Sequence, residues 1–374
     1  MASGALCFAG ELPGLLLVRL LILGSCVAIV VGFPFVRCRL AVAVVVLVSA
    51  LLLVATGASV WDAGASGARE GTKRGSSRSP CGGQAAPSRY RHVVWIIFEN
   101  QGYDHIIGNG SLRFTNTMAK ECGLATDYFG VGDPSLPNYI ALTSGGTWGV
   151  NGDSSPTLHV PSIFSQVKAR GLQWRTYSES MPSNCYLTDY PNRDPVYTAH
   201  HEPVLFYSRV RSDCRRWDVP LGTIRTGALA RDLSANTLPA FAIIGPNDDG
   251  GTVKPGCSRP CGHVDPPLSD GFLRLWTNRI VATPGYRSGK TAIFVTWDED
   301  DSFSGGLCPS LHCDHLATIV VARSVRPGTR SATMFSHYSL LRTTEELIGL
   351  PGRLGQAATA NSMAAAFHLL RARR

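Results

Sequence analysis

The sequence lacks the features that mark several special classes of protein. It has no run of five or six lysines or arginines and no internal repeat. It is also poor in charge, because 17% of its 374 residues are charged while 44% are hydrophobic. This balance excludes intrinsic disorder, which requires low hydrophobicity and high charge. The formal net charge of +8 suits anionic substrates or an anionic envelope, and without a basic run no nucleic-acid partner is expected.

Charge is almost absent from the N-terminal region, where residues 12–60 contain only three charged side chains. Two apolar stretches lie end to end there, at residues 12–35 and 40–58. The second is nearly as long as the roughly 20 apolar residues that a membrane-spanning helix needs. Arg37 and Arg39 lie between the stretches, so the positive-inside rule places this link in the cytoplasm. We therefore expect a membrane anchor, with the following domain outside the cytoplasm.

The first apolar stretch has three interpretations that lead to the same topology. It is a second transmembrane helix, or translated sequence ahead of the true start, or part of a signal peptide. Cleavage of the anchor would release a secreted protein, and retention would leave the domain on the cell membrane. We expect an anchor at residues 1–60, a flexible Ala-Gly-Ser-rich linker at 61–88 and one folded domain at 89–374.

Cysteine usage agrees with an exported domain. Three of the 11 cysteines lie in the apolar region, and an even number remains for disulfides. These eight are Cys81, Cys122, Cys185, Cys214, Cys257, Cys261, Cys308 and Cys313. The local pairs 257–261 and 308–313 are the easiest to predict. A zinc ribbon is the alternative, although neither spacing is the C-x2-C of a zinc knuckle.

The pattern of apolar segments predicts an α/β domain. Buried strands are expected at residues 92–98, 173–178, 240–244, 291–297 and 317–322. Helices are expected at residues 138–143, 161–169, 271–281 and 338–348. Strands that alternate with helices favour a three-layer α/β/α sandwich around a mainly parallel sheet.

Polar side chains follow three of these predicted strands. Glu99 and Asn100 end the first, Asp298 and Glu299 end the fourth, and residues 246–249 are polar after the third. Because sites in parallel sheets form at the carboxyl ends of strands, these side chains predict one oxygen-rich cluster. Hard oxygen ligands suit a divalent metal such as Mg, Mn or Ca, and nearby histidines keep Zn or Fe open. The alternative is that the acids cap helices or solvate loops.

Ser135 is the candidate nucleophile. It lies between Pro134 and Pro137 at the predicted start of a helix, which would hold its hydroxyl rigidly. A serine at this place, beside a metal, is able to attack phosphorus and form a phosphoenzyme. The alternative is that Ser135 only caps the helix.

Five separated blocks, taken in order, resemble the bacterial phosphoesterase family. They are residues 92–108, 134–139, 297–301, 325–329 and 337–351. This family joins phosphatidylcholine-type phospholipases C to secreted acid phosphatases, and the sequence is most similar to the small secreted phosphatases. The resemblance implies an alkaline-phosphatase-like fold.

The resemblance also implies roles for particular residues. It implies metal binding by Glu99, Asn100, Ser135, Asp298 and Glu299, with Ser135 as the nucleophile. It implies that His201 and His263 bind phosphate oxygens or protonate the leaving group, and that Asn138, Asp265 and His315 bind substrate. For each histidine, a solvated loop position is the alternative. The chain departs from the family at Asp133, where histidine is common, and at Cys261 and Gly262, where an Asn-Asp pair is usual.

The expected function is metal-dependent hydrolysis of phosphomonoesters, of the acid phosphatase type, outside the cytoplasm. The substrate would be a small phosphomonoester or a phospholipid headgroup, and the partner of the N-terminal helix would be the membrane. A phospholipase C-like phosphodiesterase is the first alternative. The family's phospholipases carry extra C-terminal domains, whereas this chain ends about 20 residues after its last block. A non-catalytic envelope binding protein is the second.

Overall fold

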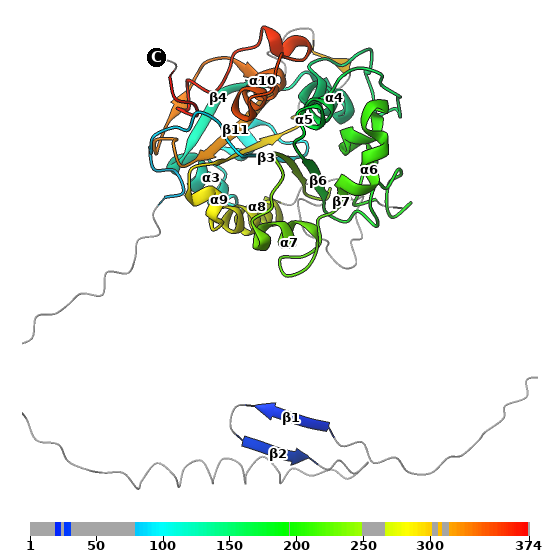
Figure 1. Cartoon of the computed structure of the whole chain (residues 1–374), viewed down its shortest axis with the longest axis vertical. Helices are drawn as coiled ribbons and strands as arrows, with labels where there is room; N and C mark the ends of the chain where they lie inside the picture. Colours follow the sequence, from blue (N-terminus) through cyan, green and yellow to red (C-terminus); the bar gives the residue numbers. More distant parts are fainter. Residues whose placement is uncertain are drawn as a thin grey trace, which may run out of the picture. The chain divides into compact units, whose positions relative to one another are not determined.

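The computed structural model describes residues 19–23, 26–30, 79–193, 195–248, 266–300, 306–308 and 314–372. The chain divides into two compact units, Met1–Thr72 and Lys73–Arg374. The second unit carries the layered domain drawn from cyan to red in Figure 1.

The N-terminal unit contains one short pair of strands. β1 (Arg19–Leu23) and β2 (Cys26–Val30) run antiparallel, with Arg19 opposite Val30. Within the described part of the stretch 12–35 the structure therefore has strands, where a helix was one interpretation. The stretch 40–58 lies outside the described residues. No helix in the described part of the chain is long and apolar enough to cross a membrane.

The second unit is built on a nine-stranded sheet, in the order β12-β4-β11-β9-β3-β8-β6-β7, with β13 also paired to β4. The strands are β3 (His92–Phe98), β4 (Gly123–Phe129), β6 (Trp174–Ser178), β7 (Asp218–Pro220), β8 (Phe241–Gly245), β9 (Thr291–Trp297), β11 (His315–Ala322), β12 (Arg330–Ser331) and β13 (Phe335–Ser336). All five predicted strands are present, and β3 and β9 have the predicted bounds. β3 lies between β8 and β9 and is parallel to both. Its residues after His92 are buried, as its continuous apolar run requires.

The sheet is mainly parallel, as predicted, but β11 is an exception. It runs antiparallel to β9 on one side and to β4 on the other. An antiparallel neighbour needs no crossover helix, whereas a parallel one does. The chain returns from β9 to β11 through β10 (Gly306–Leu307), which pairs with β5 (Gly132–Asp133).

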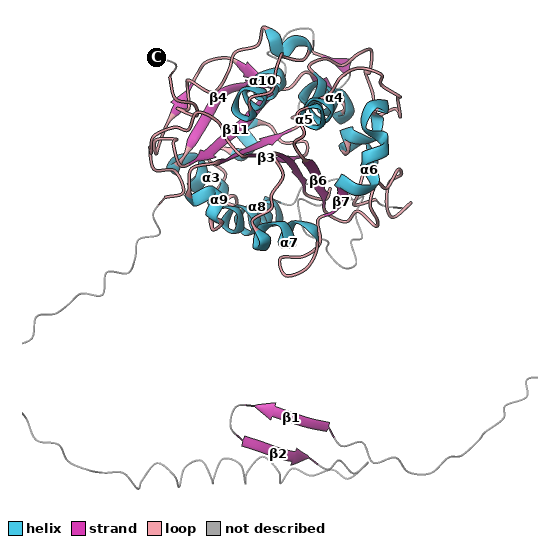
Figure 2. Ribbon diagram, viewed as in Figure 1, coloured by secondary structure: helices cyan, strands magenta, loops and turns pink. Residues whose placement is uncertain are grey.

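Helices cover both faces of the sheet, which confirms the three predicted layers (Figures 1 and 2). Figure 1 shows α3, α7, α8 and α9 below the sheet and α4, α5 and α10 above it. Their bounds are α3 (Arg113–Glu121), α4 (Ser135–Ser144), α5 (Ile163–Ala169), α7 (Ala228–Ala235), α8 (Pro266–Val281), α9 (Pro284–Arg287) and α10 (His337–Ile348). The described residues also form the short helices α2 (Tyr103–Ile106) and α6 (Arg211–Trp217). Three 3-10 turns, η1 (Ala199–His201), η2 (Pro203–Phe206) and η3 (Ser208–Val210), precede α6, and η4 (Gly355–Ala358) follows α10.

Disulfides join parts of this unit, as the even number of cysteines predicts. Cys81 pairs with Cys122, and Cys185 pairs with Cys214. Cys308 is also disulfide-bonded, so it is not a zinc ligand. The predicted pair 257–261 and the predicted partner at position 313 lie outside the described residues.

Candidate active site

Ser135 is the first residue of α4, at the end of the sheet where the strands finish. Pro134 precedes it in an extended conformation, and Pro137 falls in the first turn, where a missing N–H costs no helix hydrogen bond. The helix ends at Gly145, whose φ of 77° is the left-handed conformation that favours glycine. Every residue of α4 is buried, and Ser135 itself is 4% exposed. The serine is therefore held by a rigid, fully packed element.

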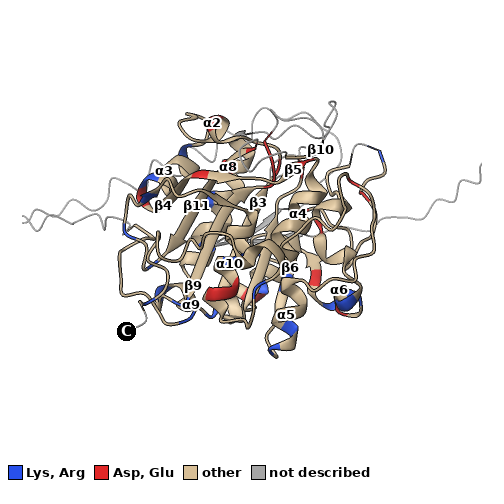
Figure 3. Cartoon of the chain, turned by 90° about the horizontal axis from the view of Figure 1, so that it is seen from above, with Lys and Arg blue, Asp and Glu red and all other residues tan. Residues whose placement is uncertain are grey.

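Three carboxylates surround this hydroxyl, and they come from two neighbouring strands. β3 and β9 are parallel, with Phe98 opposite Trp297, so the residues that follow each strand emerge side by side. The Oγ atom of Ser135 lies 3.2 Å from Oε2 of Glu99 and 3.1 Å from Oε1 of Glu299. Figure 3 shows acidic segments in red where β3 ends, close to β5 and β10. The predicted cluster at this edge of the sheet is thus present.

Asp298 completes the group from the interior. It is fully buried, and its Oδ1 atom accepts a hydrogen bond of 3.0 Å from the backbone N–H of Asn100. Its Oδ2 atom is buried and has no hydrogen-bond partner among the described residues. A buried carboxylate oxygen without a partner is costly, so the site calls for a further donor or a cation there.

The pKa shifts of these acids also indicate that the site needs a positive charge. Burial, together with the charge of Asp298, raises the pKa of Glu99 well above its ordinary value. Burial followed by the charges of Asp298 and Asp133 raises the pKa of Glu299 to about 11, and burial also raises that of Asp298. Three buried carboxylates close together cannot all be ionised without a positive charge to neutralise them.

The donor set fits a hard divalent cation. Carboxylate, hydroxyl and amide oxygens from Glu99, Asn100, Ser135, Asp298 and Glu299 are the ligands that Mg²⁺, Mn²⁺ or Ca²⁺ prefer. Among the described residues, one set of cysteine, histidine and acid ligand atoms lies mutually within 4.8 Å, that of Cys185, Cys214 and Asp218. Its two cysteines form a disulfide, so this set is not a metal site. The acids around Ser135 are spaced more widely, around a shared hydroxyl.

His201 is the histidine that the structure brings to the cluster. Its Nε2 atom lies 3.1 Å from Oε2 of Glu99, and its Nδ1 atom lies 3.3 Å from Oδ1 of Asp248. The ring also stacks on Tyr139, with 5.5 Å between centroids. Burial favours the neutral ring, but the hydrogen bond and charge of Asp248, together with the charge of Asp298, outweigh it and raise the pKa of His201. The neighbouring acids thus stabilise the imidazolium form of His201.

The residues of α4 that follow Ser135 hold the carboxylates in place. Tyr139 donates a short hydrogen bond from its hydroxyl to Oε1 of Glu99. Asn138 donates to Oε2 of Glu299 at 3.1 Å and accepts from the backbone N–H of Val131 at 2.8 Å. Asn138, a predicted substrate ligand, is fully buried, and these contacts orient Glu299 and the loop before Ser135.

The remaining predicted site residues lie elsewhere or outside the described residues. His315 stacks on Tyr103 with 4.5 Å between ring centroids, and its Nε2 atom lies 3.0 Å from the carbonyl oxygen of Thr126. No described contact joins it to Ser135. His263 and Asp265 lie outside the described residues.

Three residues at this site were not assigned by the sequence. Tyr139 lies inside the block that suggested the nucleophile, and Asp248 lies in the polar run after a predicted strand, so the sequence pattern pointed to the neighbourhood of both. No sequence pattern pointed to Asp153. Its Oδ1 atom accepts a 3.0 Å hydrogen bond from the N–H of Leu136, next to Ser135, and its Oδ2 atom lies 3.7 Å from Nε2 of His200.

Solved structures define the class of fold. The chain is similar to a structure from the metabolism of multiple glycosaminoglycans by Bacteroides thetaiotaomicron, with 12% identity, a TM-score of 0.50 and coverage of 76% of this chain and 83% of the other. This likeness shows the fold alone, a mixed α/β fold. The chain is also similar to a protein in the alkaline phosphatase superfamily from Vibrio parahaemolyticus, with 14% identity, a TM-score of 0.48 and coverage of 73% and 71%.

Sequence comparison then places the chain in a family. It is 27% identical over 269 residues to a phosphatidylinositol-3-phosphatase of Mycobacterium tuberculosis, covering 70% of this chain and 78% of the relative. It is 27% identical over 264 residues to a phosphate-repressible acid phosphatase of Penicillium chrysogenum, covering 69% of this chain but 58% of that protein. Residues 109–351 match the Phosphoesterase family. The chain belongs to this family and is a phosphoric ester hydrolase.

Proposed function

We propose that this protein hydrolyses phosphomonoesters, as an acid phosphatase, with Ser135 as its nucleophile. The observation that carries the proposal is the position of the Ser135 hydroxyl, buried at the start of α4 within 3.2 Å of two carboxylates. A serine that only caps a helix would face its own backbone amides, whereas this one faces acids from two distant strands. The names of the relatives, acid phosphatase and phosphatidylinositol-3-phosphatase, support a monoester substrate.

The first step transfers the phosphoryl group to the serine. The Oγ atom of Ser135 forms a bond to phosphorus as the ester P–O bond breaks, and its proton passes to Glu299, 3.1 Å away, whose carboxylate a bound cation would keep ionised. The leaving oxygen takes a proton from the His201 imidazolium, whose positive charge Asp248 supports. The products are a phosphoserine and the free alcohol.

The second step releases phosphate. Water attacks the phosphorus, the bond to Ser135 breaks, and the serine recovers its proton from Glu299. His201, now neutral, accepts a proton from the attacking water, which restores the starting state. A divalent cation held by Glu99, Asn100, Asp298 and Glu299 would neutralise the carboxylates and the charge that develops on the phosphoryl oxygens.

The proposed location is outside the cytoplasm. The disulfides of the folded unit, 81–122 and 185–214 among them, support an oxidising compartment, since such bonds are rare in cytosolic proteins. The proposed substrates are small phosphomonoesters or the phosphomonoester of a phospholipid headgroup.

A comparison of two simple substrates tests the proposal. The purified chain is assayed on p-nitrophenyl phosphate, a monoester, and on bis(p-nitrophenyl) phosphate, a diester, with and without a chelator. We expect the monoester to be hydrolysed at least about 100-fold faster in kcat/KM, and chelation to abolish both activities. A preference for the diester would refute the phosphomonoesterase, and full activity after exhaustive chelation would refute the role of the cation.

A further inference from the structure

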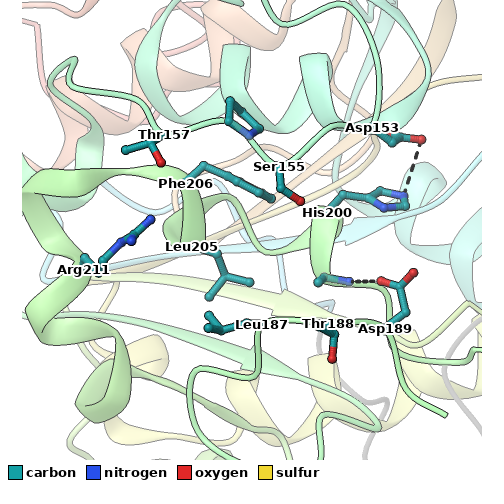
Figure 4. Close-up of a pocket in the computed structure, with 12 residues that line it drawn as sticks. Asp153, Ser155, Thr157, Leu187, Thr188, Asp189, His200, Leu205, Phe206 and Arg211 are labelled. Carbon is teal, nitrogen blue, oxygen red and sulfur yellow. Dashed lines mark hydrogen bonds and ion pairs between the residues drawn. The ribbon is translucent and has the colours of Figure 1, made fainter. Parts of the chain in front are cut away.

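A cavity of about 380 Å³ opens beside the proposed catalytic residues. One wall comes from residues 153–157, and the other comes from the segment between Cys185 and Cys214, which their disulfide closes. Figure 4 shows side chains from both walls around the pocket. Its volume lies within the range of roughly 300–1,000 Å³ typical of small-molecule sites.

Two contacts connect this pocket to the reaction centre. Asp153, at one end, accepts a hydrogen bond from the N–H of Leu136, the residue after Ser135. His200 lines the same end, and its ring centroid lies 4.5 Å from that of His201. Asp153 and His200 thus join the pocket to the sequence neighbours of the proposed nucleophile and of the proposed acid, while Ser135 and His201 themselves do not line it. A leaving group that extends from Ser135 past these neighbours would enter this space.

Two other cavities of similar size, both lined by described residues, lack this connection. One of 340 Å³ lies beside α10, between residues 334–339 and 356–361, and one of 390 Å³ lies between α3 and α8. Neither is lined by Asp153 or His200, the two residues that connect the first pocket to Leu136 and His201.

The two acids of the pocket are already engaged in holding its walls. Asp153 faces His200 at 3.7 Å in addition to Leu136, and Oδ1 of Asp189 accepts a 2.8 Å hydrogen bond from the N–H of Ala199. Figure 4 shows both contacts as dashed lines at the same end of the pocket. Both carboxylates therefore contact η1, the turn that carries His200 and His201, and help to hold it in place.

The groups left for a ligand are hydroxyls, a guanidinium and an apolar surface. The side chains of Ser155, Thr157 and Thr188 make no hydrogen bond with another described residue. Arg211 is exposed and forms no ion pair with a described residue. In Figure 4 it lies across the pocket from Asp153 and His200 and points toward Thr157 and Phe206.

This arrangement suits one kind of leaving group. Hydroxyls on the walls hydrogen-bond to a hydroxylated ring, and the buried Phe206 and Leu205 pack against its C–H face. An unpaired guanidinium at the far end suits a phosphate, which it binds through two parallel hydrogen bonds. Arg211, the one lysine or arginine among the described residues that line the pocket, lies away from the reacting end, so it recognises a second anion and not the phosphate under attack.

We propose that this pocket binds the leaving group of the substrate and that Arg211 binds a second phosphate on that group. The proposal rests on the function proposed above, because it takes Ser135 as the nucleophile. The second phosphate is either a terminal monoester, as in a sugar bisphosphate, or the diester of a lipid headgroup. Both present at least two free phosphoryl oxygens and a negative charge to the guanidinium.

The test measures competitive inhibition of p-nitrophenyl phosphate hydrolysis by the full chain. Three probes are used: fructose 6-phosphate with one phosphate, fructose 1,6-bisphosphate with a second terminal phosphate, and glycerophosphoinositol 3-phosphate with a second phosphate as a diester. We expect at least one doubly phosphorylated probe to have an inhibition constant at least about 10-fold lower than fructose 6-phosphate, because it gains a charge-assisted bidentate contact. The probe that gains most identifies the source of the second phosphate.

Three variants make the test specific. The ratio of interest is the inhibition constant of fructose 6-phosphate divided by that of the doubly phosphorylated probe. In Arg211→Gln this ratio should fall to near 1. In Arg211→Lys part of the preference should remain, because lysine keeps the positive charge but lacks the two parallel N–H donors of the guanidinium. Arg215→Gln removes the same charge from the same helix outside the pocket and should keep the wild-type ratio. Equal inhibition by all three probes in the wild type, or a ratio that survives Arg211→Gln, would overturn the proposal. Absence of any p-nitrophenyl phosphate hydrolysis would instead refute the proposed function.

Discussion

The Oγ atom of Ser135 lies 3.1 Å from the carboxylate of Glu299, although 164 residues separate the two in sequence. The sheet brings them together, because β9 delivers Glu299 to the edge at which α4 begins. The same edge receives Glu99 from β3, so one hydroxyl faces acids from two strands.

Asp298→Asn is expected to lower kcat/KM by at least about 100-fold while the fold is retained. The side chain keeps its shape, but the amide removes one charge and replaces the unpartnered Oδ2 atom with an N–H group that repels a cation. Kinetics on p-nitrophenyl phosphate measure the loss, and circular dichroism checks the fold. Asp104→Asn, the same change at an exposed position, serves as the control and should keep full activity.

A divalent cation is expected to stabilise the protein more at neutral than at acid pH. The pKa of Glu299 is raised to about 11 in the folded state by burial and by nearby acids, so without a cation its contribution to stability falls as pH rises above about 4.5. A cation at 100 times its Kd adds about 2.7 kcal/mol to the free energy of unfolding, and protons compete with it at low pH. Urea unfolding at pH 5 and 7.5, with chelator or added Mg²⁺, measures the difference. An equal or larger stabilisation at pH 5 would contradict a site made of these carboxylates.

The disulfide between Cys185 and Cys214 is expected to support both stability and activity. It closes a segment of 29 residues that contains His201, and chain-entropy arguments give such a loop about 3 to 4 kcal/mol. The double variant Cys185→Ala, Cys214→Ala should lose about that much unfolding free energy. Its kcat should also fall, since the turn that positions His201 is less constrained.

The double variant Cys81→Ala, Cys122→Ala serves as a comparison, because that disulfide lies outside the segment carrying His201. Equal losses of kcat in both would argue against the positioning role.

His337 is expected to make the fold less stable in acid. It is fully buried, with Nε2 2.6 Å from the carbonyl oxygen of Asp298 and Nδ1 3.0 Å from the Tyr128 hydroxyl, and burial lowers its pKa to about 4. A histidine with a lowered folded pKa contributes stability above its unfolded value of about 6.5, and this is lost as pH falls toward 4. Unfolding free energies at pH 5 and 7 should therefore differ less in His337→Gln than in the wild type. His159→Gln, at an exposed histidine, should leave the pH dependence as it is in the wild type.

The acid cluster was predictable because its residues follow buried strands directly. Glu99 and Asp298 each come right after a continuous apolar run, and the pairing of β3 with β9 brings them together. Both strands have the predicted bounds because a fully buried strand is apolar along its whole length. Physical patterns in the sequence were sufficient for this part of the site.

Other elements carried weaker patterns. β4 begins with Gly123 and contains Asp127, so its sequence does not have the continuous apolar run of a core strand. Its pairing with β11 and β12 in the structure defines it as a strand. The place of His201 was suggested by family resemblance alone. Asp153 approaches Leu136 from a loop, and tertiary contacts of this kind leave no periodic signal in the sequence.

The most direct test of the account is to trap the phosphoenzyme on Ser135. The purified protein is mixed with a ³²P-labelled phosphomonoester, quenched in acid within milliseconds, digested and mapped by mass spectrometry. The account predicts labelled phosphoserine at position 135, and no label in Ser135→Ala, whose turnover should fall by several orders of magnitude with a loss of stability of only about 1 kcal/mol. Label at another residue, or Ser135→Ala retaining wild-type turnover, would contradict the assignment of Ser135 as the nucleophile.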